Sequence, residues 1–155
     1  MRSGRRLAVD VGKVRVGLAI SDFHGILASP LKNIARQAED SETVKLILEA
    51  ISDEELLEIY VGLPVSMSGK STASTDDAIA LAKALSSELA TPVRMIDERL
   101  TTVSASAALR SSGKNSKQGR SVIDQVAATM ILEQALATEK STGTTPGVGL
   151  ADLDV

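Results

Sequence analysis

Three carboxylates occupy sequence settings where a charge is costly without a partner. Asp10 lies within the apolar run Leu7–Val11, Glu98 follows the short apolar stretch Val93–Ile96, and Asp124 shares a helical stripe with apolar residues. A carboxylate in a half-buried strand has to be neutralised by a basic side chain or by a metal ion. Carboxylates that meet at a sheet repel and shift one another's pKa values unless cations hold them. The elements that would position these residues decide between the two interpretations.

The first two strands are predicted from the apolar runs Leu7–Val11 and Val14–Ile20, which flank Gly12-Lys13. Glycine at the first position of a two-residue loop favours a type II′ hairpin, which would place Asp10 opposite Arg15. Side chains alternate between the faces of a strand, so one face would be large and apolar. The other face would carry Ala8, Asp10, Arg15, Gly17, Ala19 and Ser21. Apart from the two charges this face is small, so another element could pack closely on it.

The last predicted helix, Ser121–Ala137, is the best candidate for that element. Asp124 shares one stripe of this helix with Ala128, Ile131 and Ala135. Docking the stripe on the small face would bring Asp124 toward Asp10. Glu98 would stand at the carboxyl end of a strand, where open α/β sheets bind ligands, and would reach the same pocket if that strand lies near the first one.

The remaining pattern predicts a mixed sheet with helices on both faces, because a meander is followed by crossover units. Pro30 marks its strand as an edge strand or a bulged one. We expect residues 1–138 to form one domain and residues 139–155, which have tail composition, to be disordered. The other predicted elements are strands at Ile26–Ile34 and Glu58–Leu63, and helices at Val44–Ile51, about Thr75–Leu89 and about Thr102–Arg110.

Composition excludes several classes of protein. The 155 residues include no cysteine and one histidine, His24, which removes disulfides, thiolate zinc sites and cysteine nucleophiles. Phe23 and Tyr60 are the only aromatic residues, which argues against binding nucleic acid by base stacking. With a net charge of −3, a nucleic-acid site has to be a local patch. We find no membrane span or signal-peptide core and expect a cytoplasmic protein that does not bind membranes.

Basic residues for such a patch stand near the carboxylates and in one polar segment. Arg15 and Arg99 neighbour the acidic positions, and the segment "SSGKNSKQGR", predicted to be a loop, contains no acidic residue. These residues could hold a nucleic-acid backbone, and Gly12 would let a phosphate approach the main chain. The candidate nucleic-acid-binding residues of this loop are Lys114, Lys117 and Arg120. Alternatively, the loop is a solvated surface without such a role.

Four motifs carry a family resemblance over roughly residues 7–137. In chain order they are "DVGKVRVGLAISD", "VGLP", "DERLTT" and "IDQVAA". The chain resembles the YqgF/RuvX family of pre-16S rRNA nucleases and Holliday-junction resolvase-like proteins, which have an RNase H-like fold. It departs from the family pattern at Lys13, where a small hydroxyl residue is common, in "VSMSG", which replaces an Asn- and Asp-containing loop, and in the less basic "KNSKQGRS".

The resemblance implies an RNase H-like α/β fold with a five-stranded mixed sheet, three antiparallel strands coming first. It implies a nuclease that uses Mg²⁺ or Mn²⁺, with Asp10, Glu98 and Asp124 as catalytic and metal-binding residues. Asp10 would bridge two ions, which can activate water and stabilise the leaving oxygen. Arg15 and Arg99 match basic motif positions. None of this chemistry requires histidine or cysteine.

Each carboxylate also has a plainer interpretation, which stays open at this point. Asp10 could form a cross-strand pair with Arg15. Asp124 could sit at the third position of a helix capped by Ser121, and Glu98 could pair with Arg99 or lie at a helix N-terminus.

The function we expect is hydrolysis of structured nucleic acid, most of all processing of the 5′ end of pre-16S rRNA. A Holliday-junction resolvase is the alternative, with branched DNA as substrate. A junction has two-fold symmetry and calls for a dimer. No dedicated dimer helix stands out, so we expect a monomer or a weak homodimer. An actin-like ATPase would need a second aspartate–glycine hairpin, and a non-catalytic RNA-binding factor would gain nothing from acids near phosphates.

Overall fold

The computed structural model describes residues 1–100 and 117–153, without the side chains of residue 100 and residues 117–125. Its six-stranded sheet has the order β3-β2-β1-β4-β5-β6. The strands are β1 (Arg5–Val11), β2 (Arg15–Ser21), β3 (Ala28–Ala35), β4 (Leu56–Leu63), β5 (Val93–Asp97) and β6 (Val148–Gly149). The α-helices are α1 (Asp40–Ala50), α2 (Ala73–Ser87) and α4 (Lys117–Thr142), and single 3-10 turns cover Glu98–Leu100 and Leu150–Asp152.

The sheet is mixed, as the sequence predicts. β1 pairs antiparallel with β2 and parallel with β4, and β4 pairs parallel with β5. The edge strand β3 contains Pro30, and its register with β2 shifts between Leu18 and Ala19, so Pro30 is both an edge residue and close to a bulge. No helix in the described part of the chain is long and apolar enough to cross a lipid bilayer.

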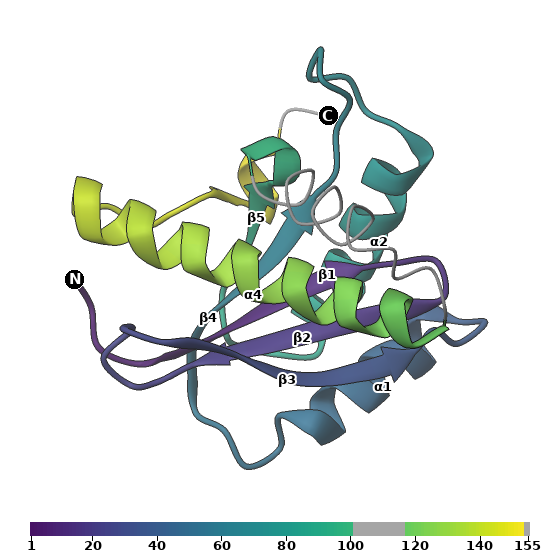
Figure 1. Ribbon diagram of the computed structural model, residues 1–155, viewed down its shortest axis with the longest axis horizontal. Helices are drawn as coiled ribbons and strands as arrows, with labels where there is room; N and C mark the ends of the chain where they lie inside the picture. The colour runs from purple at the N-terminus through teal and green to yellow at the C-terminus, as the bar shows by residue number, and fades with distance from the viewer. Residues whose placement is uncertain (101–116, 154–155) are drawn as a thin grey trace.

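Helices cover both faces of the sheet (Figure 1). One core places the large apolar residues of β1 and β2, such as Leu7 and Leu18, against α1 and α2. The second core places the small residues Ala8 and Ala19 against α4. The predicted docking of the alanine-lined helix on the small face is therefore confirmed. The α4 residues in this second core are Ala128, Ile131, Leu132, Ala135 and Leu136.

The predicted register of the first hairpin is wrong by two residues. Asp10 pairs with Gly17 and Val11 with Val16, so the strands are joined by a longer loop than Gly12-Lys13. The amide of Gly12 donates a hydrogen bond of 2.9 Å to the carbonyl of Arg15, and Gly12 does not have the positive φ of a type II′ turn. A shift of two keeps every side chain on its predicted face, because the alternation has a period of two.

Two predicted boundaries in the C-terminal part of the chain also differ from the structure. α4 begins at Lys117, so Ser121 lies inside this helix and is not its N-cap. Beyond residue 139, where composition predicts disorder, α4 continues to Thr142, and β6 pairs with β5 as a sixth strand. Arg94 holds this segment by donating to the carbonyls of Pro146 and Gly147 at 2.6 and 2.7 Å. The helix predicted at about Thr102–Arg110 lies outside the described residues.

A partly buried ionic network attaches the N-terminal segment to the C-terminal half of α4. Glu139 accepts hydrogen bonds from Arg2 at 2.6 Å and from the fully buried Arg6 at 3.0 Å. Arg2 also pairs with Glu58 at 2.8 Å, and Glu58 accepts a bond from the hydroxyl of Tyr60. Burial, and then the charge of Glu58, raise the pKa of Tyr60. The network fixes the position of α4 along the sheet.

Candidate active site at the carboxyl end of the sheet

Glu98 is held over β4 at the point where that strand has no side chain. It is 8% exposed and begins the 3-10 turn that follows β5. A Cβ at Gly62 would collide with the Glu98 carboxylate and would lie 2.7 Å from Cδ1 of Ile131 on α4. Gly62, which the sequence analysis included only within the motif "VGLP", therefore provides the space for the Glu98 side chain beneath α4.

Asp10 lies beside this position on the neighbouring strand. The parallel register of β1 and β4 pairs Val9 with Val61, so Asp10 and Gly62 are the next residues of each strand. Ala8 and Tyr60, two residues earlier, both face α4, and so Asp10 and Gly62 face α4 as well. Neighbouring strands are about 4.8 Å apart. The structure thus brings the predicted pair Asp10 and Glu98 to one face and one end of the sheet.

The helix α4 carries the third predicted carboxylate toward the same end. Glu139 contacts the start of β1 while Ile131 contacts Gly62, so α4 runs opposite to β1. Figure 1 shows the N-terminal end of α4 beside the turn that joins β1 and β2. The backbone of Asp124 lies on this part of α4, and its side chain is outside the described residues. Among the side chains that are described, no group of three or more His, Cys, Asp or Glu forms a metal cluster.

The residues that are described fit a divalent cation. Glu98 is a buried carboxylate, and Asp10 is a half-buried one on the adjacent strand. Such groups are stabilised by cations, and carboxylate oxygens are the ligands that Mg²⁺ and Mn²⁺ prefer.

Arg99 is engaged by the carboxylate of Asp97, not by that of Glu98 as the plainer interpretation of Glu98 proposed. Its Nε and Nη2 donate to Asp97 Oδ2 at 2.9 and 2.5 Å, and its Nη1 reaches the carbonyl of Met67 at 3.4 Å. The guanidinium of Arg99 lowers the pKa of Asp97, and this pair raises the pKa of Arg99 in turn. Both side chains remain more than a third exposed, so Arg99 stands at the rim of the site already bound to an anion.

The β1–β2 loop begins two residues after Asp10 with the predicted residue Gly12. A Cβ at Gly12 would lie 2.5 Å from the carbonyl oxygen of Arg15, so the tight turn itself requires glycine there. Arg15 begins β2 and pairs with Ala35 of β3. It is not directly opposite Asp10, as the predicted register required, although both residues belong to the same face.

The predicted basic segment falls partly outside the described residues. Lys114 is not described, whereas Lys117 and Arg120 lie in the first turn of α4 and not in a loop as predicted. A single glycine, Gly119, does not prevent the helix from starting four residues before Ser121. The backbone of this turn lies at the same end of the molecule as the β1–β2 loop (Figure 1).

Arg36 and Asp77 hold the β1–β2 loop near the candidate site, and the sequence did not reveal this role. Arg36 follows β3 and donates to the carbonyl of Gly12 at 2.9 Å, while its guanidinium pairs with Asp77 of α2 at 2.7 Å. The arginine lowers the pKa of Asp77. No local pattern marks this pair, because 41 residues separate the two partners.

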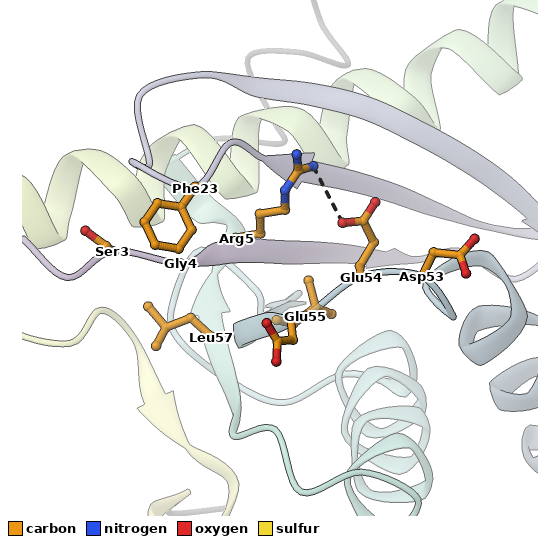
Figure 2. A pocket seen from close by; sticks show the side chains of 9 residues that line it. Ser3, Gly4, Arg5, Phe23, Asp53, Glu54, Glu55 and Leu57 are labelled. Carbon is orange, nitrogen blue, oxygen red and sulfur yellow. Dashed lines mark ion pairs between the residues drawn. The ribbon is translucent and has the colours of Figure 1, made fainter.

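A cavity of about 670 Å³ lies at the opposite end of the sheet, between the start of β1 and the segment that leads into β4. Figure 2 shows Phe23 above Gly4, and Asp53, Glu54 and Glu55 along the other side. Glu54 pairs with Arg5 at 3.5 Å. Three adjacent carboxylates repel phosphates, so this cavity does not fit a nucleic-acid backbone in spite of its size.

Comparisons with known proteins agree with this fold. The Thermus thermophilus RuvC structure in complex with a Holliday-junction substrate superimposes with a TM-score of 0.55 at 17% identity, covering 90% of this chain and 97% of that one. That likeness defines an RNase H-like α/β fold.

Among curated relatives, a Leifsonia xyli protein is 53% identical over 147 residues, covering 95% of this chain and 94% of its own. A Streptomyces coelicolor protein is 45% identical over 155 residues, covering 97% and 90%. Both relatives are named "Putative pre-16S rRNA nuclease".

The family profile RuvX, described as Holliday junction resolvase, matches residues 4–138. The chain therefore belongs to the RuvX family, a family of nucleases.

Proposed function

We propose that this protein is a divalent-metal-dependent nuclease that processes the 5′ end of pre-16S rRNA in the cytoplasm. The placement of Glu98 over Gly62, next to Asp10 and beneath α4, is the observation that carries this proposal. The names of the relatives support the substrate, and the family supports the reaction class. A plain structural ion pair would not need a glycine kept free for a buried carboxylate.

In this proposal Asp10, Glu98 and Asp124 hold Mg²⁺ or Mn²⁺, which supplies Lewis-acid stabilisation of the phosphate and activation of water. Asp10 is fixed by the β1 ladder, and Glu98 is fixed by the short turn after β5. Gly62 and Ile131 limit how far the Glu98 carboxylate can move. Rigid placement of both carboxylates keeps their geometry ready before substrate binds.

The rest of this edge would hold the nucleic-acid backbone. We assign this role to Arg15, Arg99, Lys114, Lys117 and Arg120, with Gly12 in the loop that a phosphate would approach. Contacts of this kind orient a substrate without reading its sequence. The sheet and α4 then present the scissile phosphate to the carboxylates.

The decisive experiment measures cleavage by wild type, Asp10→Asn and Glu98→Gln with Mn²⁺, Mg²⁺ or EDTA. The substrate is an RNA that carries the 5′ precursor extension. We expect cleavage by wild type only, and only with metal, while both variants still bind the RNA. Glu42→Gln, an exposed acid in the first turn of α1, is the matched control and should cleave normally. Cleavage by Asp10→Asn, or by wild type in EDTA, would refute the metal role.

Resolution of a four-way DNA junction is the second candidate, favoured by the description of the family. The same assay with a synthetic four-way junction separates the two. Symmetric cleavage of the junction and an intact RNA would reverse the order of the candidates.

A further inference from the structure

Arg36 connects the β1–β2 loop to two helices. Its Nη1 donates to the carbonyl of Gly12 at 2.9 Å and to Asp77 Oδ2 at 2.8 Å, and its Nη2 donates to Asp77 Oδ1 at 2.7 Å. Nη2 also reaches Asp40 at the start of α1 at 3.2 Å. The backbone amide of Arg36 donates to the carbonyl of Val14 at 2.8 Å. One residue therefore binds the loop on both sides of Lys13.

The form of this contact makes it directional. Arg36 and Asp77 make two parallel hydrogen bonds, and the arginine side chain is only 12% exposed. Bidentate pairs of this kind fix orientation as well as distance. A lysine at position 36 would keep the charge but could not bond Gly12 and both oxygens of Asp77 in the same geometry.

The loop carries Lys13 at the end of the sheet where Asp10 and Glu98 lie. Lys13 is exposed and lies three residues after Asp10, at the carboxyl end of β1. Its charge reaches Asp77, because it contributes with Arg36 to lowering the pKa of that carboxyl. The charges of Arg36, which is largely buried, and of the exposed Lys13 therefore both act on Asp77.

We propose that Lys13 contacts a phosphate of the nucleic-acid substrate and that Arg36, paired with Asp77, is the positioning residue for Lys13. This inference rests on the proposed function, since it assigns Lys13 to the substrate of the same site. It concerns a position where this chain departs from the pattern of the family it resembles.

The proposal predicts that the two residues act through one contact. Lys13→Gln removes the phosphate contact, and Arg36→Lys leaves the contact residue in place but frees its loop. Each variant should weaken RNA binding several-fold and reduce the slope of log affinity against log salt by about 0.7 to 0.9, the effect of one phosphate contact. The double variant should bind no worse than either single variant, because the second change has nothing left to remove.

The experiment measures binding of a fluorescein-labelled RNA hairpin with a 5′ single-stranded extension by anisotropy, in EDTA and over a series of KCl concentrations. Lys45→Gln on α1 and Arg5→Lys at the opposite end of the sheet are matched controls, since both side chains are exposed there. Hydrogen exchange of the Gly12 and Arg36 amides reports the loop directly and should accelerate in Arg36→Lys. Asp77→Asn breaks the same pair from α2 and should accelerate the same amides, which keeps the test valid if Arg36→Lys does not fold.

Normal affinity and salt slope for Lys13→Gln would overturn the proposal, and so would losses that add fully in the double variant. A structural role of Arg36 alone would lower the melting temperature without changing the salt slope. Failure of the proposed function has a different signature. The variants would then show the same coupled losses of RNA binding, but wild type would not cleave the RNA with Mn²⁺.

Discussion

The carboxylate of Glu98 occupies the space that a side chain at Gly62 would fill. The glycine belongs to β4 and the acid to the turn after β5. The Glu98 side chain therefore packs directly on the β4 backbone, where Gly62 has no side chain. A buried acid confined in this way has few rotamers available. The site can therefore be tested at a residue that carries no chemistry of its own.

Gly62→Ala should displace Glu98 and impair cleavage even though every carboxylate is retained. The added Cβ also lies 2.7 Å from Ile131 Cδ1, so we expect a stability loss of about 1 to 3 kcal/mol, typical of overpacking. Urea unfolding and the metal-dependent cleavage assay measure the two effects. Gly149→Ala is the control, because its nearest atom is the flexible Asp152 carboxylate at 3.3 Å. If Gly62→Ala cleaves like wild type, Glu98 does not need its present position.

Ala128→Leu should push α4 away from the small face of β1 and β2. Ala128 is fully buried in the core that contains Ala8 and Ala19, so the larger side chain should cost about 1 to 3 kcal/mol. Cleavage should fall further than stability explains, because Asp124 is one turn away on the same helix. Ala137→Leu makes the same change on an exposed part of α4 and should be neutral in thermal unfolding and in cleavage. A neutral Ala128→Leu would mean that the close approach of α4 is unnecessary.

Glu139→Gln should change how stability depends on pH. Burial raises the pKa of Glu139, but the hydrogen bonds and charge of Arg2 outweigh this and hold the pKa below its usual value of about 4.3. A lowered carboxyl pKa stabilises the fold fully above the unfolded pKa, and this stabilisation is lost as pH falls through the folded pKa. The free energy of unfolding of wild type should exceed that of the variant by about 3 kcal/mol at neutral pH, because the variant leaves Arg6 buried beside a neutral group.

Urea unfolding between pH 7 and pH 3 should show this difference narrowing below pH of about 4. Glu133→Gln, an exposed acid on the same helix, should differ little from wild type throughout. A gap that stays constant down to the acid limit would show that the Glu139 charge contributes nothing to stability.

Asp97→Asn should strengthen nucleic-acid binding by releasing Arg99. The neutral amide cannot hold the guanidinium as the carboxylate does, so Arg99 becomes available to a phosphate. The slope of log affinity against log salt should steepen by about 0.7 to 0.9. Asp76→Asn, an exposed acid in the first turn of α2, removes the same charge without releasing an arginine. Equal gains in both variants would assign the effect to net charge alone.

The sequence predicted the small face of the first hairpin and its cover correctly, because both follow from side-chain periodicity. The alternation of side chains along the strands and the stripe of Ala128, Ile131 and Ala135 do not depend on the type of turn, so both predictions stay correct although the predicted turn is wrong. The hairpin register could not be predicted from the sequence, because glycine fits several types of turn. The hydrogen bond between Gly12 and Arg15 favours a longer loop.

Other features depend on partners far apart in the chain. The strand β6 has two residues, too few for periodicity, and depends on Arg94 from β5. The space at Gly62 and the pairing of Arg36 with Asp77 need three-dimensional neighbours that no local pattern specifies. The roles of Asp10, Glu98 and Asp124 were inferred from family motifs and stay predictions until the variants are assayed.

The hydrogen bond from the backbone of Arg2 to Glu139 joins residues 137 positions apart. Because α4 is synthesised after the first five strands, the small face of β1 and β2 stays uncovered during most of translation. The helix can cover this face only after residues 117–142 have been made, and such long-range closure is slow compared with local folding. A nascent or truncated chain that stops before α4 would expose Ala8, Ala19 and Tyr60 to proteases and chaperones.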